Sequence, residues 1–301
     1  MSSLGRLNRL QMLLAVSLIA VCSSASAAEE APGSFRMPVY ADHGLPPART
    51  QADVDQLLAG ADPEAAAKDA AAGPLRIVLV AGQKDHAKGE HDYPAWQKVW
   101  TPLLAKAPNT EIDTAWEFPS HEQIANADVL VFYQRGRWDD DRARAIDPFL
   151  DRGGGAVYIH WAVDGRGGQV EFAKRIGLAS LGGSIRYRHG LMHIDLRPGA
   201  DHPIARNLHQ IDLNDEAYWQ LTGDPSQLDL MGTSTEDGEP QPMFWTVERG
   251  RGRVFVSIPG HYMWSFDDPL FRALLLRGIA WTARRDVDRF NNLVTLDARV
   301  E

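Results

Sequence analysis

From residue 74 onwards, short apolar runs alternate with segments whose apolar residues recur at helical spacing. The runs are rich in β-branched residues and several end in Gly or a polar residue, which is typical of central parallel strands. The pattern predicts strands at 75–82, 110–116, 128–133 and 156–160. It predicts helices at 95–105 and 139–150, and a short helix opened by Ser120. This β-α-β-α-β order favours an α/β fold, a doubly wound parallel sheet with helices on both faces.

The second half of the chain is less regular. It predicts an antiparallel or edge strand at 191–196 and further strands at 228–233, 243–247 and 253–258. A wide apolar face at 269–283 predicts a final helix, and the segment Asp267-Asp268-Pro269 is expected to cap its start. We therefore expect a mostly parallel sheet with antiparallel additions. The expected organisation is an extension or linker with one or two short helices at 28–73, one domain at 74–285 and a tail at 286–301.

The N-terminal segment has the pattern of a secretory signal. Arg6 and Arg9 give it a positive start, and the apolar run at 12–21 is too short to be a comfortable membrane span. A small-x-small cleavage pattern ends at Ala27. We expect residues 1–27 to be removed, and the mature protein, without a membrane span, to be periplasmic or secreted.

Cysteine content and charge exclude several classes of function. Cys22 is the only cysteine; its lipidation is the alternative to cleavage near Ala27, although Val21 is a poor residue directly before a lipidated cysteine. A mature chain without cysteine has no disulfide, thiolate nucleophile or thiolate metal site. The 301-residue chain has a net charge of −9, which loss of the two signal arginines takes to −11. Such an acidic chain, lacking a basic stripe, is a poor candidate for binding nucleic acid or anionic membranes, and we expect no nucleotide cofactor.

Two histidines are expected where strands end. His160 closes the strand at 156–160, and His261 follows the strand at 253–258 after a Pro-Gly pair. In an open α/β sheet, ligands bind outside the carboxyl ends of the strands. Each histidine taken alone can instead hydrogen-bond backbone carbonyls in a packed cleft.

Two further clusters carry acids and histidines. The loop after the first strand holds His86, Glu90 and His91, and the adjacent acids Asp215 and Glu216 are expected in a loop or at a strand end. Because all the clusters are predicted at one edge of the sheet, we expect a shared site. Imidazole and carboxylate together suit Zn, Mn, Fe or Ni better than Mg or Ca. The hypothesis is one divalent transition metal held by His86, His160, Glu216 and His261. The expected general base or supporting residues are Glu90, His91 and Asp215.

The other histidines have weaker claims. His189 and His193 flank a predicted strand, and they can enter the site or sit on a solvated edge. We expect structural or solvent-exposed roles for His43, His121, His202 and His209.

Aromatic residues gather in or beside the same loops. Core packing explains some of them, Trp96 and Trp100 on a predicted helix especially. Other rings offer stacking faces for the apolar side of a sugar, with acids and histidines to bond its hydroxyl groups. The residues expected to bind a small-molecule carbohydrate are Tyr93, Trp161, Tyr218, Trp219 and Trp264.

Several motifs agree in order and spacing with one family. They are the segments 153–160, 215–218, 252–261, 266–271 and 277–281. Together they resemble the ThuA-like (trehalose-utilisation) family over about 74–285. The resemblance implies a flavodoxin-like, class I glutamine-amidotransferase-like fold. In true amidotransferases a cysteine nucleophile occupies the strand-to-helix elbow; the matching residue here is His160, so cysteine-dependent glutamine hydrolysis is not expected.

The resemblance also implies a role in the metabolism of trehalose, related disaccharides or keto-sugars. We expect an exported carbohydrate-acting enzyme, a metal-assisted hydrolase, lyase or isomerase. The alternative is a non-catalytic periplasmic carbohydrate-binding protein, and a structural partner of another exported protein is a third possibility. The clustering of histidines with Glu216 favours an enzyme, and oligomeric state stays open.

Overall fold

The computed structural model describes residues 34–37 and 45–301. The predicted signal at 1–27, with Cys22 and the cleavage position, lies outside the described residues. The described residues, 34–37 and 45–301, all belong to one compact unit, Ala31–Glu301. Within the described ranges, every helix is too short or too polar to cross a bilayer.

A nine-stranded sheet runs through this unit in the order β2-β1-β3-β4-β11-β10-β9-β6-β7. Its first five strands are parallel, which confirms the doubly wound α/β prediction. Four of these five, β1, β3, β4 and β11, are almost fully buried, as their apolar runs indicate. Their bounds are β1 Leu75–Ala81, β2 Thr110–Trp116, β3 Val129–Tyr133, β4 Gly155–Ile159 and β11 Gly252–Ser257.

The other four strands are antiparallel additions, as predicted for the second half of the chain. The apolar pattern does not predict β7, because the adjacent acids Asp215 and Glu216 interrupt its apolar residues. The assignment of Asp215 and Glu216 to a loop or strand end is therefore wrong: both are buried within β7. The bounds are β6 Arg186–Asp195, β7 Gln210–Trp219, β9 Asp229–Glu236 and β10 Glu239–Arg249, and a separate two-stranded sheet pairs β5 Leu178–Ala179 with β8 Thr222–Gly223.

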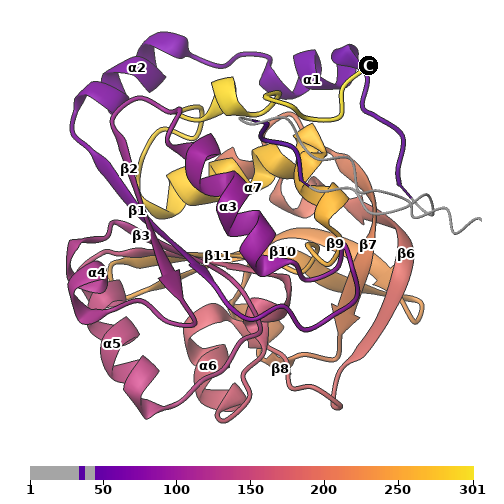
Figure 1. Ribbon diagram of the computed structural model, residues 1–301. Helices are drawn as coiled ribbons and strands as arrows, with labels where there is room; N and C mark the ends of the chain where they lie inside the picture. Colours follow the sequence, from indigo (N-terminus) through magenta and orange to yellow (C-terminus); the bar gives the residue numbers. More distant parts are fainter. Residues whose placement is uncertain (1–33, 38–44) are drawn as a thin grey trace, which may run out of the picture. The chain divides into compact units, whose positions relative to one another are not determined.

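Helices lie on both faces of the sheet (Figure 1). α3 and α7 lie on one face, with α1 packed beside α7, and α4, α5 and α6 lie on the other. The apolar pattern does not predict the short α6. The bounds are α1 Gln51–Leu58, α2 Pro63–Ala71, α3 Tyr93–Leu104, α4 His121–Asn126, α5 Asp140–Asp151, α6 Gln169–Ile176 and α7 Pro269–Thr282.

Helix starts follow their predicted signals. Ser120 caps α4 in a reciprocal capping box with Gln123. Asp268 caps α7 by accepting hydrogen bonds from two backbone N–H groups of its first turn, and Pro269 occupies the first helical position. The predicted caps of these two helices are confirmed.

The buried Arg272 joins α7 to the end of the chain. Its guanidinium donates to the carbonyl oxygens of Phe266 at 3.0 Å and Leu296 at 2.5 Å, and to the carboxylate of Asp267 at 3.2 Å. The same carboxylate accepts the backbone N–H of Met37. One buried ion pair therefore holds parts of both terminal segments against the helical layer.

Candidate metal centre and pocket

Four buried side chains meet at the carboxyl edge of the parallel strands. His91 comes from the loop between β1 and α3, His160 directly follows β4, and His261 follows β11. Glu216 reaches them from the middle of β7. Their relative exposures are 1% for His91, 0% for His160, 5% for Glu216 and 1% for His261. The edge that sequence reasoning selected is where this cluster forms.

Backbone geometry at two of these positions is unusual. His91 has a φ of 43° and His160 a φ of 56°, both in the left-handed region that non-glycine residues seldom adopt. His160 adopts it at the first residue of the 3₁₀ turn η1 His160–Val163, where β4 ends. Strained backbone that points side chains at one another is a feature of functional sites.

The four ligand-type atoms lie within 4.8 Å of one another. His91 Nε2 is 2.7 Å from His160 Nε2 and 3.0 Å from His261 Nδ1. Glu216 Oε2 is 2.8 Å from His261 Nδ1 and 3.3 Å from His160 Nε2. Tetrahedral zinc with bonds of about 2.0–2.1 Å has ligand–ligand edges of about 3.3 Å. The cluster therefore has the dimensions of a slightly contracted coordination shell.

Hydrogen bonds on the far sides of two rings assign their protons. His160 Nδ1 is 2.7 Å from the carbonyl oxygen of Ile258, which can only accept, so this nitrogen carries the proton. His91 Nδ1 is 2.9 Å from a carboxylate oxygen of Asp85 and is assigned as its donor. In the neutral rings, both Nε2 atoms then present lone pairs to each other. A positive ion between them would relieve that repulsion, and far-side partners of this kind are typical of metal-bound histidines.

The electrostatics favour a neutral His91 ring in the same cluster as an ionised Glu216. Burial lowers the pKa of His91 to about 2, and the neighbouring His160 and His261 reinforce this against the hydrogen bond to Asp85. Burial raises the pKa of Glu216, but the hydrogen bonds of His160 and His261 outweigh it and hold that pKa far below its ordinary range. These are the protonation states that a divalent cation needs in its ligands.

A pH dependence of stability follows from the lowered pKa of His91. The unfolded chain binds a proton on this ring below its ordinary pKa of 6.5, whereas the folded protein resists it down to about 2. The contribution of the neutral His91 ring to folding stability is therefore fully present above pH 6.5, and it is lost as the pH falls from 6.5 towards about 2. We expect the melting temperature of metal-free protein, followed by circular dichroism, to fall between about pH 7 and about pH 4. His91→Gln is expected to show a smaller fall in melting temperature over this pH range. An equal fall in both proteins would show that protonation of His91 is not the cause.

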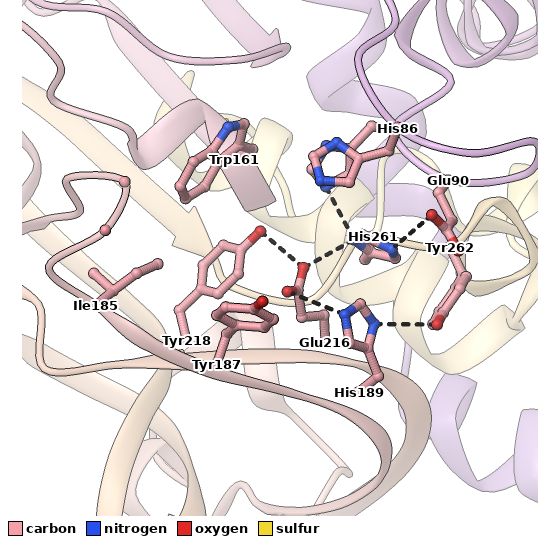
Figure 2. Close-up of a pocket in the computed structure, with 13 residues that line it drawn as sticks. His86, Glu90, Trp161, Ile185, Tyr187, His189, Glu216, Tyr218, His261 and Tyr262 are labelled. Carbon is pink, nitrogen blue, oxygen red and sulfur yellow. Dashed lines mark hydrogen bonds and ion pairs between the residues drawn. The ribbon is translucent and has the colours of Figure 1, made fainter.

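A pocket of about 600 Å³ opens beside the cluster. Figure 2 shows Glu216 and His261 at its centre, between aromatic side chains and the loop that carries His86 and Glu90. Three of the four cluster residues, His91, Glu216 and His261, line it. The other lining residues are His86, Glu90, Trp161, Gly182, Gly183, Ile185, Tyr187, His189, Tyr218 and Tyr262. A small molecule in the pocket would therefore contact the cluster directly.

The structure brings three of the four expected metal ligands together and places the fourth outside. His160, Glu216 and His261 belong to the buried cluster, and His91, expected as a base or support, takes the remaining position. The side chain of His86 is 42% exposed; its Nδ1 lies 2.9 Å from Asp85, in a second group with Asp85 and His91. His86 therefore lies at the pocket wall beside the cluster.

Two of the expected base or supporting residues have different positions: Glu90 lies at the pocket wall, and Asp215 supports the loop that carries His261. Glu90 lines the pocket, with its carboxylate 3.6 Å from His261 Nε2, for which the described part of the chain provides no hydrogen-bond partner. Asp215 faces away from the pocket, toward the loop after β11. It accepts the backbone N–H of Gly260 at 3.1 Å and of His261 at 2.8 Å, and the hydroxyl of Ser265.

Asp215 is expected to matter through the position of His261. In Asp215→Ala, two buried backbone N–H groups lose their acceptor, at a cost of about 2–4 kcal/mol in the free energy of unfolding. Glu90→Gln, at the pocket wall, should change it by less than about 0.5 kcal/mol. Urea denaturation measures both variants. Equal stability of the two would assign Asp215 a different role.

Two of the five expected carbohydrate-binding aromatics line the pocket, Trp161 and Tyr218. The other three do not line the pocket, and each makes a polar contact to another part of the chain. The buried Tyr93 hydroxyl donates to Asp85 and lies 2.9 Å from His91 Nδ1. The indoles of Trp219 and Trp264 donate to Asp237 and to the carbonyl of Asn214, respectively.

Sequence reasoning missed Tyr187 at the pocket wall and left the place of His189 open. Tyr187 and His189 alternate along β6 and share one face, which the alternation around 186–189 signals. His189 lies 3.5 Å from Glu216 and 3.1 Å from the Tyr262 hydroxyl, so it enters the site rather than a solvated edge. His193 remains on the exposed part of the strand, 2.9 Å from Asp212.

Fold and site together define a doubly wound α/β protein with a histidine–carboxylate cluster at the carboxyl edge of its parallel strands. A family model described as ThuA, trehalose utilisation, matches residues 77–282, more than half of the chain. The chain belongs to this ThuA family, as its motifs indicate. No curated protein matches it by sequence.

Two solved structures share this architecture. A ThuA-like protein from Parabacteroides merdae is 19% identical with a TM-score of 0.55, and the match covers 70% of this chain and 90% of that one. A ThuA-like protein from Bacteroides uniformis is 16% identical with a TM-score of 0.56, covering 69% and 92%. The expected flavodoxin-like, class I glutamine-amidotransferase-like fold is confirmed by this likeness.

Proposed function

We propose that the protein is a metal-dependent enzyme of carbohydrate metabolism, a hydrolase, lyase or isomerase of a disaccharide or keto-sugar. The observation that carries the proposal is the convergence of three buried imidazoles and one carboxylate at the base of an open pocket. Membership of the trehalose-utilisation family supports the carbohydrate substrate. The signal-like pattern at 1–27 supports export.

The residues fit a divalent transition metal better than an alternative hydrogen-bonded cluster. Two Nε2 lone pairs face each other at 2.7 Å, and the far-side nitrogens of both rings are already used by Asp85 and Ile258. Zn, Mn, Fe and Ni all accept imidazole and carboxylate ligands. The proposed ligands are His91, His160, Glu216 and His261. Such a metal would polarise a keto or hydroxyl oxygen of the sugar and lower the pKa of bound water.

The surrounding residues would bind and orient the sugar. Trp161 and Tyr218 offer ring faces at the pocket wall, while Glu90 and His189 offer hydrogen-bonding groups near the cluster. The Tyr218 hydroxyl donates to Glu216 at 2.9 Å and fixes that carboxylate. A cysteine-dependent amidotransferase is not proposed, because His160 occupies the elbow position of the nucleophile.

Metal analysis combined with turnover tests this proposal. Protein purified without an affinity tag is expected to contain about one equivalent of a transition metal by elemental mass spectrometry. Turnover of trehalose or its keto derivative should be lost on chelation and restored by the same metal. Metal-free protein that binds these sugars without converting them would instead identify a carbohydrate-binding protein.

A further inference from the structure

The pocket has two halves of different chemistry. Figure 2 shows charged and hydrogen-bonding side chains on one side of Glu216 and mostly apolar ones on the other. The polar half contains His86, Glu90, His189, His261 and Tyr262, and the apolar half contains Trp161, Gly182, Gly183, Ile185, Tyr187 and Tyr218. A ligand that fills the whole pocket must therefore be polar at one end and apolar at the other.

The apolar half is built from rings in fixed positions. Trp161 and Tyr218 meet edge to face, with centroids 5.3 Å apart at 61°. Tyr218 also stacks on His160, at 4.7 Å and 25°, and its hydroxyl lies 2.7 Å from His160 Nε2. Tyr187 is 60% exposed although it is a large aromatic residue. The rings of Trp161 and Tyr218, fixed by these contacts, and the exposed ring of Tyr187 form a preformed surface for stacking.

This half offers few hydrogen bonds to a ligand. Arg186 and Arg188 flank Tyr187 in β6, but they pair with Asp237 and Glu236 on the opposite face. Among the described residues that line the apolar half, none carries a charge. A second sugar ring there would lose water from several hydroxyl groups without replacing their hydrogen bonds.

Glycine keeps space open in front of the indole. A Cβ atom at position 182 would already lie 3.7 Å from Cζ2 of Trp161. A branched side chain at Gly182 would therefore add atoms beside the indole and take up space that a ligand stacked there needs. Space of this kind beside an indole suits a flat group.

We infer that the substrate is a glycoside carrying an aryl group, whose flat ring binds between Trp161, Tyr187 and Gly182 while the sugar oxygens meet the cluster. The inference goes beyond the disaccharide or keto-sugar of the proposed function and rests on the proposed site, because the His–Glu cluster would bind the sugar end. It replaces the second sugar of a disaccharide by an apolar aromatic aglycone.

Isothermal titration calorimetry with matched ligands tests the inference. Phenyl glucoside is expected to bind at least about tenfold more tightly than methyl glucoside of the same anomeric form, and more tightly than trehalose. Gly182→Val should reduce this preference to about twofold or less while leaving methyl glucoside affinity unchanged. Trp161→Ala should also reduce the preference to about twofold or less, because it weakens phenyl glucoside binding more than methyl glucoside binding. Trp116→Ala, which removes an exposed indole on β2, is the matched control and should keep the full preference.

The outcomes separate the two claims. Equal affinity for phenyl and methyl glucoside, no binding of phenyl glucoside at millimolar concentration, or a preference that survives Gly182→Val and Trp161→Ala would overturn the aryl inference. If metal is present and the sugars are turned over without an aryl preference, the proposed function stands alone. If the aryl preference is present in protein that contains no metal, the apolar subsite stands and the metal-dependent reaction fails.

Discussion

His160→Ala is expected to lose the proposed metal and to reduce turnover at least about a hundredfold, while the fold persists. The reason is geometric: His160 Nε2 lies 2.7 Å from His91 Nε2 and 3.3 Å from Glu216, so its loss opens the coordination shell on two edges. Removal of a partner that merely orients a ligand costs about 10–100-fold in metal affinity, and removal of a ligand should cost more. Elemental mass spectrometry and turnover measure the effect.

The matched control is His193→Ala. This histidine is exposed on β6, where it pairs with Asp212 outside the pocket. Metal content and turnover should match the unsubstituted protein, and circular dichroism should show that both variants are folded. Full metal occupancy and full turnover in His160→Ala would refute the proposed metal centre. Asp85→Asn, which alters the far-side partner of His91 but removes none of the proposed ligands, should give an intermediate loss.

Arg272→Met is expected to lower the free energy of unfolding by about 3–5 kcal/mol. Arg272 is fully buried, and its replacement leaves the Asp267 carboxylate without its cation and several carbonyls without a donor. Breaking a buried ion pair from one side is costly because the remaining charge has lost its compensation. Guanidinium chloride denaturation measures the loss.

A double variant separates charge from packing. Arg272→Met combined with Asp267→Asn removes both charges, so part of the stability should return relative to Arg272→Met alone. Arg144→Met provides a surface control, because its pair with Asp141 is exposed and should contribute less than about 1 kcal/mol. If Arg272→Met were no more destabilising than Arg144→Met, the ion pair would not secure the terminal segments.

The sequence predicts the parallel half of the fold well, for a physical reason. β1, β3, β4 and β11 are buried on both faces, so each is a nearly continuous apolar run. The strand-end positions of His160 and His261 follow directly from those runs. β7 has no such run, because buried acids interrupt it. Their partners lie far away in the sequence, so the local pattern does not indicate that these acids can be buried. Asp215 binds the loop at 260–261, and Glu216 binds two histidines.

The sequence predicts His86 as a member of the buried cluster, whereas the structure places His91 there. Both histidines lie in one loop, and residue type and spacing do not decide which ring turns inward. The loop is folded back by Lys84, whose ammonium donates to the carbonyls of Ala87 and Glu90, and by the left-handed backbone of His91. These contacts bury His91 and leave His86 at the pocket wall.

The long sequence separations among the cluster residues have a consequence for the order of assembly. His91 is 69 positions from His160 and 170 from His261, so no short segment of unfolded chain contains the cluster. Bringing such distant positions together requires the sheet to be formed first. The metal-free chain must therefore fold unaided, and a cation that binds only the native state then adds stability by mass action. Under this order, metal uptake reports the completion of folding, and chelation should shorten the lifetime of the folded state without slowing its formation.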